Sequence, residues 1–228
     1  MNDIQLTLLH RDLWVSSIFL LVTAAFAIPF QSINILLYGV ILSSAYWITR
    51  TFVRNGIAFP GGIPNIITLS RFLLLLICTF LHDQFTLFQL GIAYTLVCVG
   101  DFFDGFFARK WNQSSTLGEY LDKETDAVFV LILTCMIYIE IHQSNWVLIA
   151  GLIRYVYFTS IYFFMDENEK EPKDPWARII AVFLFIALLG QFTLPQNISK
   201  PVLLMATASI LYSFGRSLSY QLKMITKR

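Results

Sequence analysis

The chain has 228 residues, of which 57% are hydrophobic and only 14% are charged, and its formal net charge is +1. A soluble domain does not carry so many apolar residues, and so small a net charge gives no indication of nucleic-acid binding. The composition therefore predicts an integral membrane protein of the all-α class, built as a polytopic membrane helix bundle.

Eight apolar stretches qualify, or nearly qualify, as membrane spans, because a spanning helix needs about 20 mainly apolar residues. In chain order they are Leu13–Phe30, Ile33–Ile48, Ile66–Leu81, Phe85–Ala108, Leu121–Ile141, Trp146–Phe164, Ile179–Leu194 and Pro201–Leu222. The proline- and glycine-rich segment 60–64 marks a break before the third stretch. The sequence thus predicts about eight transmembrane helices and no soluble domain.

Lysine and arginine residues gather in alternate loops, which is the pattern that sets membrane orientation. One set of loops and termini holds Arg11, Arg50, Arg54, Lys110, Lys170, Lys173, Lys223, Lys227 and Arg228, whereas the opposite loops hold Lys200. Both termini are therefore expected in the cytosol, with the inner or cytoplasmic membrane as the location if the source is a bacterium.

The most polar stretch near the predicted spans is 101–126, DFFDGFFARKWNQSSTLGEYLDKETD. It contains four aspartates in two pairs, Asp101 with Asp104 and Asp122 with Asp126. A single charge at the centre of a spanning helix costs roughly 2.5–3.5 kcal/mol, so four of them need an explanation. Helical spacing places each pair on one helix face, and a polar turn over 110–116 would bring the two pairs together at the cytosolic side.

Carboxylates this close together repel one another unless a cation lies among them. Ligands that are all oxygen select a hard ion, which predicts Mg²⁺ or Mn²⁺, and such ions are commonly completed by substrate phosphates. Arg109 adds a fixed positive charge suited to phosphate oxygens. The simpler alternative, that the aspartates cap helix ends and line a turn, explains one or two of them but not four at this spacing.

The pattern Asp-x2-Asp-Gly-x2-Ala-Arg-x8-Gly-x3-Asp-x3-Asp resembles the signature of the CDP-alcohol phosphotransferase (phosphatidyltransferase) family of integral membrane enzymes. Its positions here are Asp101, Asp104, Gly105, Ala108, Arg109, Gly118, Asp122 and Asp126. A second element, Pro64-Asn65-x2-Thr68-x2-Arg71, resembles the start of the first helix of the family core. By itself this element reads equally well as an ordinary helix start with a snorkelling arginine.

The resemblance covers about 62 to 222, the six-helix core of the family. It therefore implies two domains, a two-helix membrane extension over 1–55 and the core over 56–228. The sequence gives no functional account of the extension. The resemblance also allows a homodimer.

The resemblance implies an enzyme of phospholipid biosynthesis. Such an enzyme transfers a phosphatidyl group from a CDP-linked lipid donor, usually CDP-diacylglycerol, to the hydroxyl group of a small polar alcohol, and CMP leaves. The implied metal ligands are Asp101, Asp104, Asp122 and Asp126, and Asp126 is also the implied general base. The implied diphosphate-binding residues are Asp104, Gly105, Ala108, Arg109, Gly118, Asn65 and Thr68.

The acceptor alcohol is the least determined part of the prediction. Arg154 lies about nine residues into a predicted span, where a lipid-facing charge is penalised most, so it is expected to point into the bundle. There it could bind an anionic acceptor, such as glycerol 3-phosphate or inositol phosphate, or pair with a carboxylate such as Glu140 or a motif aspartate. Arg71 and Arg178 are further candidates for the acceptor site.

Two other functions compete with the enzyme. A divalent-cation transporter would carry acidic residues near the bilayer midplane on several helices, whereas here they gather at one edge beside an arginine. A catalytically dead scaffold would be expected to lack one of the four motif aspartates, and all four are present.

Overall fold

The computed structural model describes residues 3–57, 62–110, 115–164 and 175–226. These residues form eight α-helices: α1 (Asp3–Ala27), α2 (Ile33–Ile48), α3 (Ile63–Phe80), α4 (Leu87–Lys110), α5 (Thr116–Glu140), α6 (Leu148–Phe164), α7 (Pro175–Thr193) and α8 (Gln196–Thr226). A π-helical segment, η1 (Thr49–Arg54), continues α2, and short 3₁₀ turns, η2 (His82–Gln84) and η3 (Asn145–Val147), precede α4 and α6. The described ranges contain no strand, so the predicted all-α bundle is confirmed.

Each predicted apolar stretch corresponds to one helix, although the ends differ. The α8 helix begins at Gln196 rather than at the predicted Pro201, which lies inside it. In the described residues, five helices are long and apolar enough to cross a membrane: 7–27, 33–54, 63–80, 176–193 and 196–220. Among the other three helices, the described side chains of α4 form a shorter apolar stretch, Leu87–Asp101, while α5 carries acidic residues in its first turns and α6 has 17 residues.

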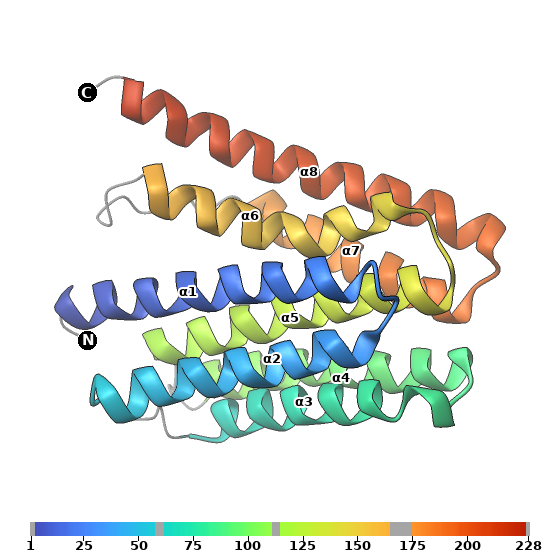
Figure 1. The fold of residues 1–228 in the computed structure, drawn as a ribbon, viewed down its shortest axis with the longest axis horizontal. Helices are drawn as coiled ribbons and strands as arrows, with labels where there is room; N and C mark the ends of the chain where they lie inside the picture. Colours follow the sequence, from blue (N-terminus) through green and yellow to red (C-terminus); the bar gives the residue numbers. More distant parts are fainter. Residues whose placement is uncertain (1–2, 58–61, 111–114, 165–174, 227–228) are drawn as a thin grey trace.

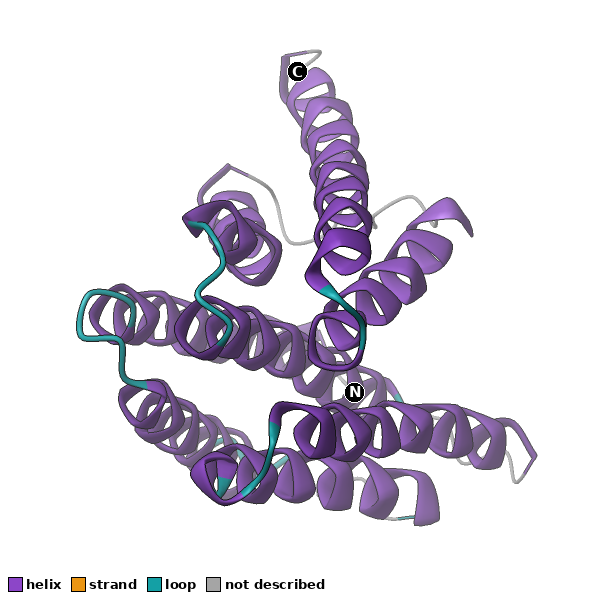
Figure 2. Ribbon diagram, turned by 90° about the vertical axis from the view of Figure 1, so that its right-hand side faces the viewer, coloured by secondary structure: helices purple, strands orange, loops and turns teal. Residues whose placement is uncertain are grey.

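The helices run side by side, and α1 begins at the same end of the bundle at which α8 finishes (Figure 1). That end also holds the start of α3, the end of α4 and the start of α5. Figure 2 views the molecule from the opposite end, where teal connections join successive helices. The predicted alternation of loops between two sides is thus visible in the fold, and the acidic motif lies at the end that the termini share.

The central helix is α5, which contacts α2, α3, α6 and α7. Its second half is apolar around most of its circumference, as expected of a helix that is surrounded by others. Buried residues there include Phe129, Leu131, Ile132, Leu133, Cys135, Met136 and Ile137. The fold therefore anchors one half of α5 in the core and leaves its first turns, with Asp122 and Asp126, at the end of the bundle.

Small residues let neighbouring helices approach closely, as is common in membrane bundles. Gly39 on α2 faces Thr23 on α1, and Gly151 on α6 faces Thr134 on α5. A methyl group at either glycine would overlap the threonine side chain. These contacts fix the α1–α2 and α5–α6 pairs at short separations.

Candidate active site

Three of the four motif aspartates meet at one end of the bundle. Asp101 comes from α4, and Asp122 and Asp126 come from successive turns of α5. One carboxylate oxygen from each lies within 4.8 Å of the other two. The side chains of Asp101, Asp122 and Asp126 are 45%, 39% and 32% exposed, so solvent reaches all three. The structure therefore brings Asp101 together with Asp122 and Asp126, as their spacing predicts.

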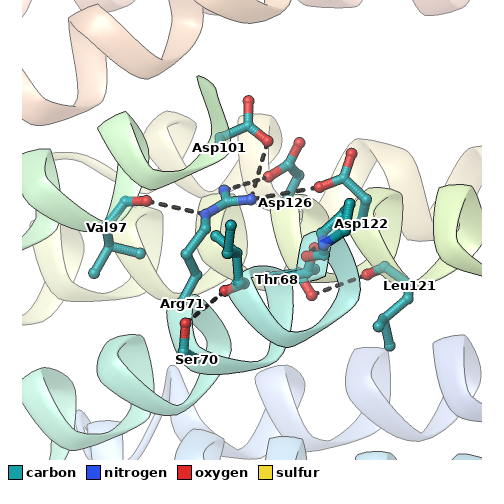
Figure 3. Close-up of polar contacts among 11 residues, drawn as sticks. Thr68, Ser70, Arg71, Val97, Asp101, Leu121, Asp122 and Asp126 are labelled. Atoms are coloured by element: carbon teal, nitrogen blue, oxygen red, sulfur yellow. Dashed lines mark hydrogen bonds and ion pairs between the residues drawn. The ribbon is translucent and has the colours of Figure 1, made fainter. Parts of the chain in front are cut away.

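The guanidinium group of Arg71 from α3 lies against all three carboxylates (Figure 3). Its Nη1 donates to Oδ1 of Asp101 at 3.0 Å and to Oδ1 of Asp122 at 3.4 Å. Its Nη2 donates to Oδ1 of Asp126 at 3.1 Å, and its Nε donates to the carbonyl oxygen of Val97 at 3.1 Å. The Arg71 side chain is only 4% exposed, so it does not snorkel to the surface.

The charges of this cluster do not balance. A buried arginine requires counter-charges, and the carboxylates supply them. Counted over these four described side chains alone, one guanidinium and three ionised carboxylates carry two net negative charges. An oxygen-only set with this excess charge and partial exposure is suited to a hard divalent cation. Arg71, one of the residues considered for the acceptor site, is thus placed among the proposed metal ligands.

Gly100 makes room for Arg71 and was not identified from the sequence. A Cβ atom at Gly100 would lie 2.9 Å from Cγ and 3.0 Å from Cδ of Arg71. The stem of Arg71 therefore crosses α4 where that helix has no side chain. The available signal was a glycine inside a helix, directly before Asp101. Glycine costs about 1 kcal/mol there relative to alanine, which calls for a packing reason.

The first turns of α3 and α5 also lie in close contact. Asn65 and Thr68 of α3 are both buried, and Thr68 Oγ1 donates to the carbonyl oxygen of Pro64 at 3.1 Å. A Cβ atom at Gly118 would lie 2.6 Å from Oδ1 of Asn65. Ser115 caps α5 by accepting a hydrogen bond from the Gly118 amide at 3.0 Å. Gly118 thus allows α5 to start directly against Asn65.

The remaining motif residues fall in the last turns of α4, and their side chains lie outside the described part of the structure. These residues are Asp104, Gly105, Ala108 and Arg109. The helix itself continues to Lys110, so they keep the helical spacing that the sequence predicts. Their roles as a fourth metal ligand and as diphosphate contacts stay predictions.

Arg154 on α6 pairs with Glu124, a residue that the sequence analysis did not consider. Arg154 Nη2 donates to Oε1 of Glu124 at 2.5 Å, and the two side chains are 33% and 22% exposed. At about 100° per residue, Glu124 lies on nearly the opposite face of α5 from Asp122 and Asp126. Arg154 therefore contacts the side of α5 that carries Glu124, and it is still near enough to Asp126 for the two charges to interact.

Glu140 and Arg178, which were also considered for the pairing or the acceptor site, lie away from Arg154. Glu140, the expected alternative partner of Arg154, instead has Oε1 3.5 Å from Nε2 of His82. Arg178 is exposed on the first turn of α7.

Comparison with known proteins adds an independent result. A model of the family described as CDP-alcohol phosphatidyltransferase matches residues 62–213, which leaves α1 and α2 outside the match. Curated relatives named CDP-diacylglycerol–glycerol-3-phosphate 3-phosphatidyltransferase occur in Escherichia coli (strain K12), Escherichia coli O157:H7 and Shigella sonnei (strain Ss046). Each is 34% identical over 88 residues, which are 37% of this chain and 47% of the relative. The match thus spans about half the length of these relatives.

Proposed function

Because the chain belongs to the CDP-alcohol phosphatidyltransferase family, as its motif predicts, we propose that it transfers a phosphatidyl group from CDP-diacylglycerol to a small polar alcohol. The observation that carries the proposal is the cluster of Asp101, Asp122 and Asp126 at one end of a membrane-type bundle. The names of the curated relatives make glycerol 3-phosphate the first acceptor to test. Inositol phosphate, the other anionic acceptor considered from the sequence, is the second.

The proposed cofactor is Mg²⁺ or Mn²⁺, held by Asp101, Asp122 and Asp126, with Asp104 as the proposed fourth ligand. The described donors fit such an ion because they are all carboxylate oxygens, lie within 4.8 Å of one another and are partly exposed. When bound, the cation would neutralise diphosphate charge and stabilise the charge that develops on the departing CMP.

The proposed reaction exchanges one phosphorus–oxygen bond for another. The acceptor hydroxyl oxygen bonds to the phosphorus that carries diacylglycerol, and the bond from that phosphorus to the bridging diphosphate oxygen breaks, so CMP leaves. Asp126 takes the hydroxyl proton as general base. Arg71 holds the Asp126 carboxylate in a fixed orientation through the 3.1 Å contact from its Nη2.

Residues of α3, α4 and α5 would bind the nucleotide part of the donor. Arg109 would contact the diphosphate oxygens, and the small residues Gly105 and Ala108 would let the nucleotide approach the helix backbone. Asn65, Thr68 and Gly118 would shape the floor of the same site. In support of this assignment, Asn65 and Gly118 adjoin each other in the fold.

The acceptor is proposed to be anionic, with Arg154 as its ligand and Arg178 as a second candidate. The phosphate of the acceptor would then replace Glu124 as the partner of Arg154. We also propose that the site and both termini face the cytosol. The loop distribution of lysine and arginine supports this orientation, as does the shared end of the bundle in Figure 1. The lipid donor would enter sideways from the bilayer, and the alcohol would arrive from the cytosol.

The test is CMP release by the purified protein in detergent, with CDP-diacylglycerol, Mn²⁺ or Mg²⁺ and a panel of alcohols. Asp126→Asn should lower acceptor-dependent release by about 100-fold to 10,000-fold, the range for a general base. Asp83→Asn is the matched control, because the Asp83 side chain is 84% exposed and adjoins His82, away from the cluster. The proposal fails if no alcohol on any CDP-linked donor supports release, and cation flux in liposomes then becomes the next measurement.

A further inference from the structure

The helices α1 and α2 lie outside the family match, yet α2 packs against α5, the helix that carries two of the site aspartates, and α1 meets α5 through side chains. At the end of the bundle near the site, a second apolar cluster joins α1, the α2–η1 segment and α5. Its buried members are Leu9, Leu13, Trp47, Ile57 and Leu117, with Phe52, Tyr120, Leu121 and Phe158 packed around them. The first turns of α5 therefore rest on the N-terminal extension.

A hydrogen bond within this contact connects α1 directly to α5. His10 Nε2 lies 2.6 Å from Oη of Tyr120, and the two rings meet edge to face with centroids 5.5 Å apart. Tyr120 is two residues before Asp122, so helical geometry places it on nearly the opposite face of α5. It shares that back face with Glu124, four residues later, which pairs with Arg154.

The α1 segment that carries His10 is itself tied down. Asp12, two residues later, is fully buried. It accepts hydrogen bonds from Nδ2 of Asn55 at 2.8 Å and from Nε of Arg50 at 3.4 Å. Arg50 belongs to the π-helical segment η1, and Asn55 follows it. A buried carboxylate without these partners would lower the free energy of unfolding. The hydrogen bonds of Asp12 therefore hold α1 to the end of α2.

From these contacts we propose that the N-terminal extension is a brace for the active site, and that His10 is a positioning residue acting through Tyr120. The bond fixes the rotation of the first turns of α5, and therefore the direction in which Asp122 and Asp126 face Asp101 and Arg71. This inference rests on the proposed role of the three aspartates in metal binding. If the extension were ordinary packing, loss of the bond would cost stability but would leave the cation site unchanged.

The experiment compares five variants of the whole chain, one of which combines His10→Ala with Tyr120→Phe. His10→Ala and Tyr120→Phe remove the bond, and His10→Gln keeps a polar group at a similar reach. Ser16→Ala is the matched control, because it removes a hydrogen bond between α1 and α2, to Ser43, without touching α5. The measurements are Mn²⁺ affinity by electron paramagnetic resonance titration, hydrogen exchange of residues 116–122 and the melting temperature.

Mn²⁺ affinity should fall on the order of fivefold in His10→Ala and in Tyr120→Phe, the effect of losing one hydrogen bond. Exchange over residues 116–122 should accelerate in both variants, and His10→Gln should restore much of the difference. The double variant should be no weaker than either single one, because both remove the same interaction. Ser16→Ala should keep wild-type Mn²⁺ affinity even where its melting temperature falls equally.

The brace proposal is wrong if His10→Ala keeps the Mn²⁺ affinity or the hydrogen exchange of the wild type. It is also wrong if Ser16→Ala loses as much Mn²⁺ affinity as His10→Ala. These outcomes differ from failure of the proposed function. If the wild-type protein binds Mn²⁺ but releases no CMP, the transferase proposal fails while the brace is still decided by affinity and exchange. If the wild-type protein binds no Mn²⁺, the metal site fails, and the exchange of residues 116–122 decides the brace alone.

Discussion

The two faces of the first turns of α5 differ in how their charges are balanced. On the front face, Asp122 and Asp126 share one guanidinium, that of Arg71, with Asp101 of α4. On the back face, Glu124 pairs with Arg154, and Tyr120 bonds to His10. Counted over these described groups, the front carries excess negative charge and is partly exposed, whereas the back pairs one carboxylate with one guanidinium. The first turns of α5 thus present one face that can bind a cation and an opposite face that is held by contacts with α1 and α6.

The largest expected difference is between two variants that each neutralise one carboxylate, one on the front face and one on the back face. Asp122→Asn should lower CMP release on the order of 100-fold and weaken Mn²⁺ binding, because it removes a proposed metal ligand. Glu124→Gln, two residues away and the same kind of change, should leave Mn²⁺ affinity within about twofold, because its partner neutralises it already. Equal losses of Mn²⁺ affinity in the two variants would contradict the distinction between the faces.

Arg71→Lys should produce the next largest effect. An ammonium group is a point charge and cannot reproduce the planar fork that contacts three carboxylates and the carbonyl oxygen of Val97. CMP release should fall by about tenfold to 100-fold, the size reported for lost orienting partners of metal ligands. Arg54→Lys, at an exposed arginine of η1, is the control and should behave as the wild type. Full activity of Arg71→Lys would show that charge alone suffices.

The sequence predicts most of the fold because hydropathy over about 20 residues decides whether a segment is a membrane helix. Every predicted stretch lies on one of the eight helices. The predicted helix ends are less accurate. A helix that packs against its neighbours can continue through polar first turns and through an internal proline, such as Pro201 in α8. Fixed spacing along α4 and α5 likewise brought Asp101, Asp122 and Asp126 together without knowledge of the tertiary structure.

Contacts between helices could not be predicted in the same way. Which residue of α3 faces the aspartates depends on the rotation of that helix, which no local pattern reports. Arg71 therefore read equally well as a snorkelling side chain, and Gly100 was overlooked although it makes room for Arg71. Glu124 was overlooked as the partner of Arg154 for the same reason, since Glu140 is equally acidic and only packing distinguishes them.

A smaller effect is expected when the space for Arg71 is filled. Gly100→Ala adds a methyl group 2.9 Å from Cγ of Arg71. Overpacking of this kind costs about 1–3 kcal/mol of unfolding free energy, and it should displace the guanidinium and lower CMP release. Gly215→Ala in α8 meets no atom within 4 Å and should instead be neutral or stabilise by about 0.5–1 kcal/mol. Thermal unfolding of both variants in detergent tests this contrast.

The smallest expected effects concern the back face. They test whether Arg154 also binds the acceptor. If a phosphorylated acceptor replaces Glu124 on Arg154, then Glu124→Gln should lower KM for glycerol 3-phosphate by about threefold, because the acceptor no longer competes with a carboxylate. Arg154→Gln should raise the same KM by about tenfold, the effect of losing a hydrogen bond to a charged group, while kcat changes little. Should both variants lose kcat at constant KM, the pair only locks α5 in place, and the acceptor is bound elsewhere. Initial rates over a range of glycerol 3-phosphate concentrations, at saturating CDP-diacylglycerol, separate the two roles.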